Sequence, residues 1–451
     1  MARVHAHGRR TAAALHCLFP RAAPRGAAGG RGPDPRSGHS AVSAPYVVVG
    51  GGAAGLCAAC ALALKGARVR VLEAQPRVGR KLLSTGNGRC NILNMDTNIA
   101  HWHGDAALAR PVLDRWPPDR IRGFFAKLGL ETVEEAEGRV YPVSRQAASV
   151  LDALRLTIPL HGGEITTDAR VQSIRRPAGG NGWALTLASG ETVTASKVLI
   201  AAGGQAAPKL GGCADGVKLL KSLGHRAGKC FPAIAALRTD PARVRALKGQ
   251  RVHGAVSLCA DGRTLRKEAG EILFGDGTLS GIAAMQCARA AQEALMEGGQ
   301  PQAVLCLTDM PYEAFVGRAR LLKGHLMEDV LTGLLPKRVG MEIVKAAGID
   351  LHATAETLDE RQLKKLYETV TKWRFPVTGV HGYDQAQVTA GGIRLSGFDT
   401  DTMQSRLAPG VFAAGEVLDI DGDCGGFNLR WAWASALTAA EGMLRSNGTK
   451  G

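Results

Sequence analysis

Residues 46–91 read YVVVGGGAAGLCAACALALKGARVRVLEAQPRVGRKLLSTGNGRCN, and this stretch decides the fold. The apolar run 46–49 predicts a buried strand, and the Ala- and Leu-rich segment after it predicts a helix. Gly50, Gly52 and Gly55 lie between the two in G-x-G-x-x-G spacing. A second strand, 68–72, ends at Glu73, about 20 residues further on. This strand–glycine turn–helix–strand order with a terminal acid is typical of dinucleotide binding.

Each glycine of this turn has a separate physical role. Gly50 permits the tight turn, Gly52 lets the backbone approach a pyrophosphate, and Gly55 lets the helix pack close to the strand. The helix N-terminus, at Ala53, offers free N–H groups and a positive dipole end to the phosphates. Glu73 is expected to accept hydrogen bonds from a ribose. The alternative is a glycine-rich turn in an α/β protein that binds no nucleotide.

The composition is that of a globular enzyme with two or three domains. The chain has 451 residues, of which 45% are hydrophobic and 21% charged. Its longest apolar run, 53–64, is too short to span a bilayer, so we expect no transmembrane segment. An α/β protein without a membrane contact, acting on a small molecule, is the class that these values favour.

The net charge of +16 is unevenly distributed. Residues 1–43 contain seven Arg against one acid, Asp34, which leaves about +10 for the remainder. This basic leader has no hydrophobic periodicity and is expected to be disordered. It is open to three interpretations: a mitochondrial transit peptide, a twin-arginine export signal at Arg9-Arg10, or an unselected extension, which we favour. The basic remainder is interpreted as a solvated surface rather than a nucleic-acid site.

The ten cysteines form no framework. Cys57 and Cys60 make a C-x-x-C inside the first helix, whereas a redox pair is expected at a helix start, so we interpret them as core residues. No Cys/His cluster has metal-ligand spacing, and no metal site is predicted. The pattern is typical of a reduced, cytoplasmic protein.

Two further groups of residues are expected near the nucleotide. Gly79-Arg80-Lys81 and the loop 86–91, GNGRCN, combine glycines with basic side chains and suit a loop around a diphosphate; a basic surface loop is the alternative. Strands are expected at 164–174, 183–187 and 192–200, and the last delivers a second glycine turn at 201–204.

The segment from 226 to 384 differs in its sequence pattern from the glycine-rich segments on either side of it. It mixes strand-like runs at 255–260 and 303–308 with charged helical stretches at 312–331 and 358–372. We interpret it as an inserted domain, part β and part helical, within a discontinuous Rossmann-like domain formed by 44–225 and 385–446.

The C-terminal part favours FAD as the dinucleotide. Glu416 or Asp419 can supply a carboxylate to the ribityl hydroxyls, and the helix that opens at 425–428 offers N–H groups to the N1/C2=O edge of a flavin. Gly391-Gly392 and Gly415 permit close backbone approach. Unrelated β-turns are the alternative.

From about Pro45 to Gly442 the chain resembles the BaiN/RdsA-type NAD(P)/FAD-dependent oxidoreductases. The strings GRKLLSTGNGRCN, IAAGGQAAPKLG and GEVLDIDGDCGGFNLRWAWAS carry the resemblance. It implies an FAD domain with an inserted domain. It also implies FAD contacts at Gly50, Gly52, Ala54, Gly55, Glu73, Lys81, Gly415, Glu416 and Asn428. Some family members are named reductases of conjugated enones in dehydro-bile acids, and others carry an aminoacetone oxidase label.

The chain departs from the family pattern at four places. Gly275-Asp276 and Ile282 lie in the expected inserted domain and leave the substrate open. Ala436 replaces a Gly in the last helix. Arg430 replaces a common Gln next to the flavin-facing turn, where it would either place a positive charge near the reduced flavin or point to solvent.

Motifs and resemblance together predict that the chain binds FAD as its cofactor. NAD(P)H is a possible electron donor. Only one G-x-G-x-x-G has the strand–helix context, so no separate nicotinamide domain is expected. The predicted cofactor contacts are Gly50, Gly52, Ala53, Ala54, Gly55, Glu73, Arg80, Lys81, Gly88, Arg89, Cys90, Asn91, Val171, Ala202, Gly203, Gly415, Glu416, Asp419, Gly426 and Asn428.

Three activities follow from this prediction. The first is NAD(P)H-linked reduction of a conjugated C=C bond in a small or steroid-like substrate. The second is oxidation of an amine, and the third is modification of a nucleic acid such as tRNA. For the first, Tyr141 is the candidate acid and Arg145 the candidate that orients a carboxylate or carbonyl, against a packing or ion-pair role for each.

Overall fold

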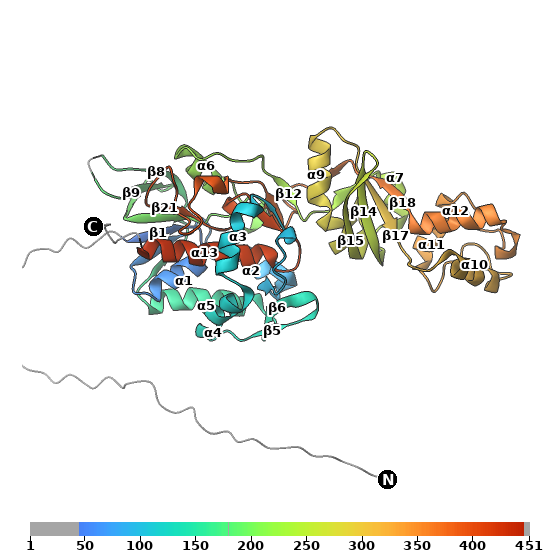
Figure 1. Ribbon diagram of the computed structural model, residues 1–451, viewed down its shortest axis with the longest axis horizontal. Coiled ribbons are helices and arrows are strands. Elements are labelled where there is room, and N and C mark those ends of the chain that lie inside the picture. The colour runs from blue at the N-terminus through green and yellow to red at the C-terminus, as the bar shows by residue number, and fades with distance from the viewer. Residues whose placement is uncertain (1–44, 179, 446–451) are drawn as a thin grey trace, which may run out of the picture. The chain divides into compact units, whose positions relative to one another are not determined.

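The computed structural model describes residues 45–178 and 180–445 (Figure 1), which belong to one compact unit. The predicted disordered leader, 1–43, and its three interpretations lie outside the described residues. None of the described helices is long and apolar enough to cross a membrane.

A five-stranded parallel sheet forms the centre of the nucleotide-binding part. Its β-branched residues suit strands that are buried on both faces. The outermost strand, β21, comes from the far end of the chain, so the sheet is discontinuous in sequence, as predicted. In spatial order the strands are β21 (Val411–Ala413), β11 (Lys197–Ile200), β1 (Tyr46–Val49), β2 (Val69–Leu72) and β7 (Glu164–Thr166).

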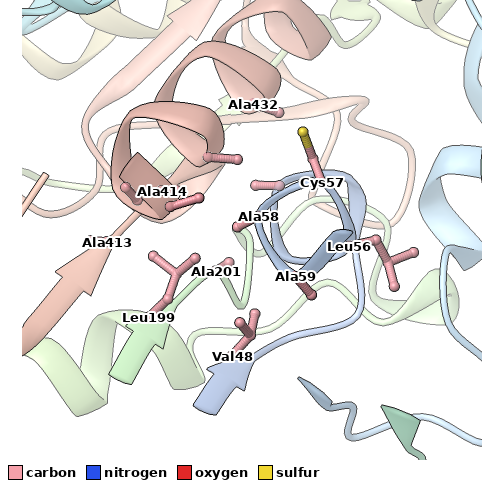
Figure 2. Close-up of a cluster of buried hydrophobic side chains, with 14 of the residues drawn as sticks. Val48, Leu56, Cys57, Ala58, Ala59, Leu199, Ala201, Ala413, Ala414 and Ala432 are labelled. Carbon is pink, nitrogen blue, oxygen red and sulfur yellow. The ribbon is translucent and has the colours of Figure 1, made fainter. Parts of the chain in front are cut away.

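Small side chains bring the first and last helices of this part together. Helix α1 (Ala53–Ala63) lies beside α13 (Phe427–Arg445), blue beside red in Figure 1. Figure 2 shows Cys57, Ala58 and Ala59 of α1 packed near Val48, Leu199 and Ala432. Cys57 and Cys60 are fully buried in the middle of α1, and burial raises the pKa of both thiols, that of Cys60 to about 12. Both cysteines are therefore neutral core residues.

Smaller sheets and helices complete this part of the chain. One antiparallel sheet has the order β10 (Thr192–Ala195), β9 (Trp183–Leu187), β8 (Val171–Arg175), and another has the order β3 (Leu93–Asn94), β6 (Arg139–Pro142), β5 (Thr132–Glu134). Strand β22 (Ile420–Gly422) pairs with β4 (Trp102–Gly104). The helices are α2 (Arg80–Ser84), α3 (Ala106–Arg115), α4 (Pro118–Lys127), α5 (Ala147–Leu160) and α6 (Asp215–Ser222).

A second hydrophobic core lies around a seven-stranded antiparallel sheet. Its order is β18 (Trp373–Pro376), β17 (Gln302–Cys306), β14 (Arg251–Ala260), β15 (Arg263–Phe274), β16 (Thr278–Ser280), β13 (Leu237–Arg238), β19 (Gly379–Val380). Its helices are α7 (Pro241–Val244), α8 (Ile282–Gln286), α9 (Ala288–Met296), α10 (Tyr312–Leu321), α11 (Lys337–Ala346) and α12 (Glu360–Thr371). A ribbon of β12 (Phe231–Ala233) and β20 (Val388–Ala390) lies where the chain enters and leaves this segment. The exact domain limits, 226 and 384, stay a prediction.

Two predicted strands are each divided in the structure. The expected strand 164–174 is β7 and β8, which belong to different sheets and are separated by a turn with Asp168 at φ 54°. The expected strand 192–200 is β10 and β11, which also belong to different sheets. Continuous β-propensity concealed both breaks, because the chain changes sheets without a glycine or proline to mark the corner.

Candidate functional site

A cavity of about 810 Å³ opens at the carboxyl ends of β1, β2, β11 and β21. This edge of a parallel sheet is where α/β proteins bind nucleotides. The volume is within the range of cofactor and ligand pockets. The cavity therefore lies where the glycine motif predicted a dinucleotide.

The three motif glycines differ in what surrounds them. Gly50 has φ 106°, and a Cβ there would lie 2.5 Å from the carbonyl oxygen of Ala201. A Cβ on Gly55 would lie 1.8 Å from the Gly50 carbonyl oxygen, so this residue lets α1 pack close to the turn. A Cβ on Gly52 would meet no atom within 4 Å. Gly50 and Gly55 are thus required by the fold, whereas Gly52 faces open space in the cavity wall.

One end of the cavity is organised by Glu73. Its carboxylate accepts hydrogen bonds from the backbone N–H groups of Gly51 (2.6 Å) and Gln75 (2.7 Å). Arg80 donates to the Gln75 side chain (2.5 Å) and to the Lys209 carbonyl (2.8 Å). These bonds hold the acid at the tip of β2 beside the glycine turn, the position expected for a ribose-binding carboxylate.

An ion pair lies between this end and the rest of the cavity. Lys81 Nζ is 2.7 Å from Glu416 Oε2, and the other carboxylate oxygen of Glu416 accepts from the Thr389 N–H at 2.8 Å. Both side chains line the cavity. Lys81 and Glu416 are separated by more than three hundred positions and meet only in the folded chain.

The opposite end combines a glycine turn with polar side chains. Gly425 and Gly426, with φ 116° and 104°, precede α13, and a Cβ on Gly426 would lie 2.8 Å from Asn91 Oδ1. A Cβ on Gly425 would lie 3.8 Å from Arg139 Nε. Tyr141 is on the same strand, β6, two residues after Arg139, so both point to one side of it. This end therefore presents a helix N-terminus, an amide, a phenol and a guanidinium to one space.

Seventeen of the predicted residues line the cavity. They are Gly50, Gly52, Ala53, Ala54, Glu73, Arg80, Lys81, Arg89, Asn91, Tyr141, Val171, Ala202, Gly203, Gly415, Glu416, Gly426 and Asn428. Arg89 lies with Tyr141, its guanidinium 4.3 Å from the centre of the phenol ring, rather than near the motif glycines. Arg89 therefore lies beside Tyr141 in the cavity wall, and its contact with a diphosphate stays a prediction.

Five predicted residues are not part of the cavity wall, namely Gly55, Gly88, Cys90, Arg145 and Asp419. Cys90 is fully buried, and Arg145 pairs with Glu135 at 2.8 Å. Asp419 pairs with Arg394 at 2.8 Å, and burial raises the pKa of this carboxyl. Arg145 is thus an ion-pair partner. Of the two carboxylates predicted for the ribityl hydroxyls, Glu416 lines the cavity and Asp419 does not.

Arg430 matches neither of its two expected positions. It is 2% exposed and does not line the cavity. Its guanidinium lies 5.0 Å from the centre of the Trp102 ring and donates to the Asp96 carbonyl at 2.9 Å. Burial lowers its pKa to about 10. Its side chain therefore points neither to solvent nor into the cavity. Arg430 lies in the first turn of α13 and packs against Trp102.

Sequence reasoning missed Arg139, Asp423, Ile282 and Met285 as residues of the cavity wall. Alternation along a strand was the available signal for Arg139, had β6 been recognised. Ile282 and Met285 come from α8, next to the seven-stranded sheet, and form an apolar part of the wall. No local pattern connects α8 with the glycine turn, so only the tertiary structure places them together.

Asp423 is the most strongly bound carboxylate of the site. It is 8% exposed and lies 2.9 Å from His101 Nδ1, 2.9 Å from His103 Nε2 and 2.8 Å from an Arg266 nitrogen. Burial alone would raise its pKa, but the hydrogen bonds from His103, Arg266 and His101 outweigh burial and hold the pKa at about 2. The group is therefore ionised at neutral pH.

We expect Asp423 to make folding sensitive to acid. Its folded-state pKa lies below the ordinary value of 3.8, so between the two values the unfolded chain binds more protons. The stability from this group is present above about pH 4 and is lost as the pH falls toward about 2. Urea unfolding at a series of pH values should show a shallower acid-dependent loss of unfolding free energy in Asp423→Asn. The exposed-pair control Asp152→Asn should keep the wild-type slope, and equal slopes for wild type and Asp423→Asn would contradict the assignment.

A family model described as HI0933-like protein Rossmann domain matches residues 44–442. The chain belongs to the HI0933-like family. It is 33% identical to a 3-dehydro-bile acid delta(4,6)-reductase of Clostridium scindens, over 87% of this chain and 97% of that protein. It is 28% identical to a ribosomal RNA dihydrouridine synthase of Escherichia coli, over 88% and 97% respectively.

Among solved structures, this HI0933-like chain is similar to a 3-ketosteroid-delta4-(5alpha)-dehydrogenase from Rhodococcus jostii RHA1. The TM-score is 0.48 at 16% identity, covering 91% of this chain and 99% of that one. Family membership makes the protein an FAD-dependent oxidoreductase with a Rossmann fold, so the predicted enzyme class and FAD are confirmed, whereas NAD(P)H as electron donor stays a prediction.

The residues of this HI0933-like protein fit FAD. The N-terminus of α1 has no side-chain cap, and Gly52 leaves room beside it for a diphosphate. At the far end, Asn91 Oδ1 is a buried acceptor that no donor reaches among the described residues. An uncapped helix N-terminus and an unpartnered acceptor in one cavity are what a bound dinucleotide with polar edges would satisfy.

Proposed function

We propose that the protein is an NAD(P)H-linked reductase of a C=C bond conjugated with a carbonyl group, in a small or steroid-like substrate. The observation that carries the proposal is the 33% identity, over nearly the whole of both chains, to a protein named as a reductase of this bond type. Bound FAD would supply hydride acceptance and donation at its N5 position.

The residues at the Gly425–Gly426 end suit such a substrate. Hydride addition to a conjugated C=C bond moves negative charge onto the carbonyl oxygen, and preorganised donors stabilise that charge. Arg139, Arg89 and Tyr141 line this end; Arg139 is also paired with Glu137, and Arg89 with Glu135, so each guanidinium would share its N–H groups with the substrate. Ile282 and Met285 provide an apolar surface for the carbon skeleton. Tyr141 is retained as the candidate donor to the carbonyl, whereas Arg139 takes the place proposed for Arg145.

An anaerobic titration tests the electron donor and the reaction. We expect the visible FAD bands of the purified protein to bleach with NADH or NADPH, and to return when a 4-ene-3-ketosteroid is added. The reduced steroid should appear in equal amount by mass spectrometry. FAD that bleaches with neither nucleotide but does so with an amine, and is reoxidised rapidly by O2, would instead establish the amine oxidase.

A second candidate is reduction of a uracil base in RNA. Two relatives carry the name ribosomal RNA dihydrouridine synthase, and the ring bond reduced in dihydrouridine is also conjugated with a carbonyl. The excess of about ten positive charges outside residues 1–43 is compatible with an RNA partner. If reduced protein is reoxidised by uridine-containing ribosomal RNA, with dihydrouridine formed, and not by the steroid, this second candidate replaces the first.

A further inference from the structure

A hydrogen-bonded chain connects the protein surface to the Gly425–Gly426 end of the cavity. Its inner member is Asp423, which lines the cavity and is 8% exposed. Its middle member is His101, whose Nδ1 lies 2.9 Å from Asp423 Oδ2. Its outer member is Asp96, whose Oδ2 lies 3.0 Å from His101 Nε2 and whose side chain is 51% exposed. Each imidazole nitrogen of His101 thus faces a carboxylate, one in solvent and one at the cavity.

The fold holds His101 rigidly in this position. Its ring stacks on Phe427, the first residue of α13, with centroids 4.2 Å apart and planes inclined by 16°. The Asp423 N–H donates to the His101 carbonyl oxygen at 2.9 Å. Two independent contacts therefore fix the imidazole to the segment that opens the last helix.

The proposed reaction needs what such a chain can deliver. Reduction of a C=C bond adds one hydride and one proton, and the proton must reach a carbon inside the cavity. Resting on the proposed function, we propose that Asp96, His101 and Asp423 carry this proton from solvent to the substrate. A proton from hydronium, which is left as water, binds at His101 Nε2 beside Asp96, the Nδ1–H bond breaks, and that proton passes to Asp423 Oδ2, which holds it only transiently because the carboxylate is ionised at rest. The new O–H bond then breaks as the substrate carbon is protonated, which leaves Asp423 ionised and His101 neutral with its ring hydrogen on Nε2; that hydrogen must return to Nδ1 before the next turnover.

Other charged groups around Asp423 do not offer an equivalent route. Arg266 from β15 stays protonated and pairs with Glu268, which accepts from Gln286. A guanidinium has N–H donors but no acceptor, so Arg139 and Arg430 cannot take up a proton, and burial raises the pKa of the Cys424 thiol to about 12. His103 contacts the same carboxylate through Nε2 and interacts electrostatically with Asp421, but among the described residues it has no hydrogen bond to a second carboxylate that reaches solvent. His103 is therefore the matched control for His101.

The test separates the two halves of the catalytic cycle in the FAD-loaded protein. In His101→Ala, bleaching by NAD(P)H should proceed at the wild-type rate, because that half needs no proton on a substrate carbon. Reoxidation by the 4-ene-3-ketosteroid should slow by about 100-fold, the usual contribution of a positioned proton donor. Added imidazole should restore the rate in a saturable manner. In His103→Ala the reoxidation rate should fall at least tenfold less than in His101→Ala, and added imidazole should not raise it.

His101→Gln distinguishes a relay from a structural contact. The amide of Gln can still donate a hydrogen bond to Asp423 but cannot pass a proton from one side to the other. We expect His101→Gln to be as slow as His101→Ala. A wild-type rate in His101→Gln, or equal losses without imidazole rescue in His101→Ala and His103→Ala, would overturn the relay.

The relay can be judged even if neither the 4-ene-3-ketosteroid nor another enone substrate reoxidises the protein, in which case the proposed function itself fails. Menadione consumes protons when it is reduced, whereas ferricyanide takes electrons alone. Slower reoxidation of His101→Ala by menadione, with an unchanged ferricyanide rate, would then support the proton path. Equal ratios of the two rates in wild type and variant would refute it.

Discussion

A Gly52→Ala protein is expected to fold normally and to purify without FAD. The backbone at Gly52 has φ −83°, which any residue adopts, and a Cβ there meets no protein atom within 4 Å. The added methyl group would instead occupy the space that the diphosphate needs beside the α1 N-terminus. Overpacking of this kind costs about 1–3 kcal/mol, or roughly 10- to 100-fold in affinity. Absorbance at 450 nm and calorimetric titration of the apoprotein with FAD measure the loss.

Two other glycines serve as controls for this result. Gly123→Ala lies in α4, where a Cβ meets nothing within 4 Å, and should bind FAD as the wild type does. Gly55→Ala places a Cβ 1.8 Å from a backbone oxygen and should fail to give folded protein. A folded Gly52→Ala protein that retains its yellow colour would contradict the assignment of the cavity to FAD.

Removal of the Asp421 carboxylate should cause a large loss of stability. Asp421 lies in β22, its side chain is 3% exposed, and it pairs with Arg289 of α9, whose side chain is 17% exposed. Taking away this partner leaves Arg289 with only Glu293, whose side chain is 44% exposed, and Asp421→Ala is expected to cost about 3 kcal/mol, because the penalty for breaking a buried pair is larger than the pair's net contribution. The midpoint and slope of urea unfolding, followed by circular dichroism, measure this change.

The exposed pair Asp152–Arg155 provides the comparison. Both side chains are 44% exposed, and Asp152→Ala should leave the unfolding midpoint close to that of the wild type. A double variant, Asp421→Ala with Arg289→Met, should recover part of the stability because the cation that lost its buried partner is gone. An Asp421→Ala protein as stable as the wild type would show that β22 and α9 are not held together by this pair.

Local patterns predicted the parts of the site that lie close together in sequence. The strand, the glycine turn, the helix and the acid at the end of β2 are all within thirty residues, so β-branching, glycine geometry and apolar periodicity specify them without help from the rest of the chain. The structure confirms each of these roles for Gly50 and Gly55 and leaves Gly52 facing the cavity. The C-terminal glycine turn before α13 was predicted for the same reason.

Side-chain direction and long-range pairing could not be predicted from the sequence. Arg139 was not considered as a candidate, because only the pleat of β6 shows that it shares a face with Tyr141. Asp419 and Glu416 were equivalent as candidates until Arg394 was seen to bind Asp419 and Lys81 to bind Glu416.

The sequence by itself determined the parallel sheet, the place of the cavity at its edge and the class of enzyme, because these depend on short motifs whose backbone geometry is nearly independent of context. Tertiary structure alone decided how the far end of the cavity is built. There, Asp421 meets Arg289 across 132 positions, and Asp423 gathers His101, His103 and Arg266 from separate elements. The physical reason is that burial and charge pairing depend on which surfaces come into contact, and no local periodicity records that.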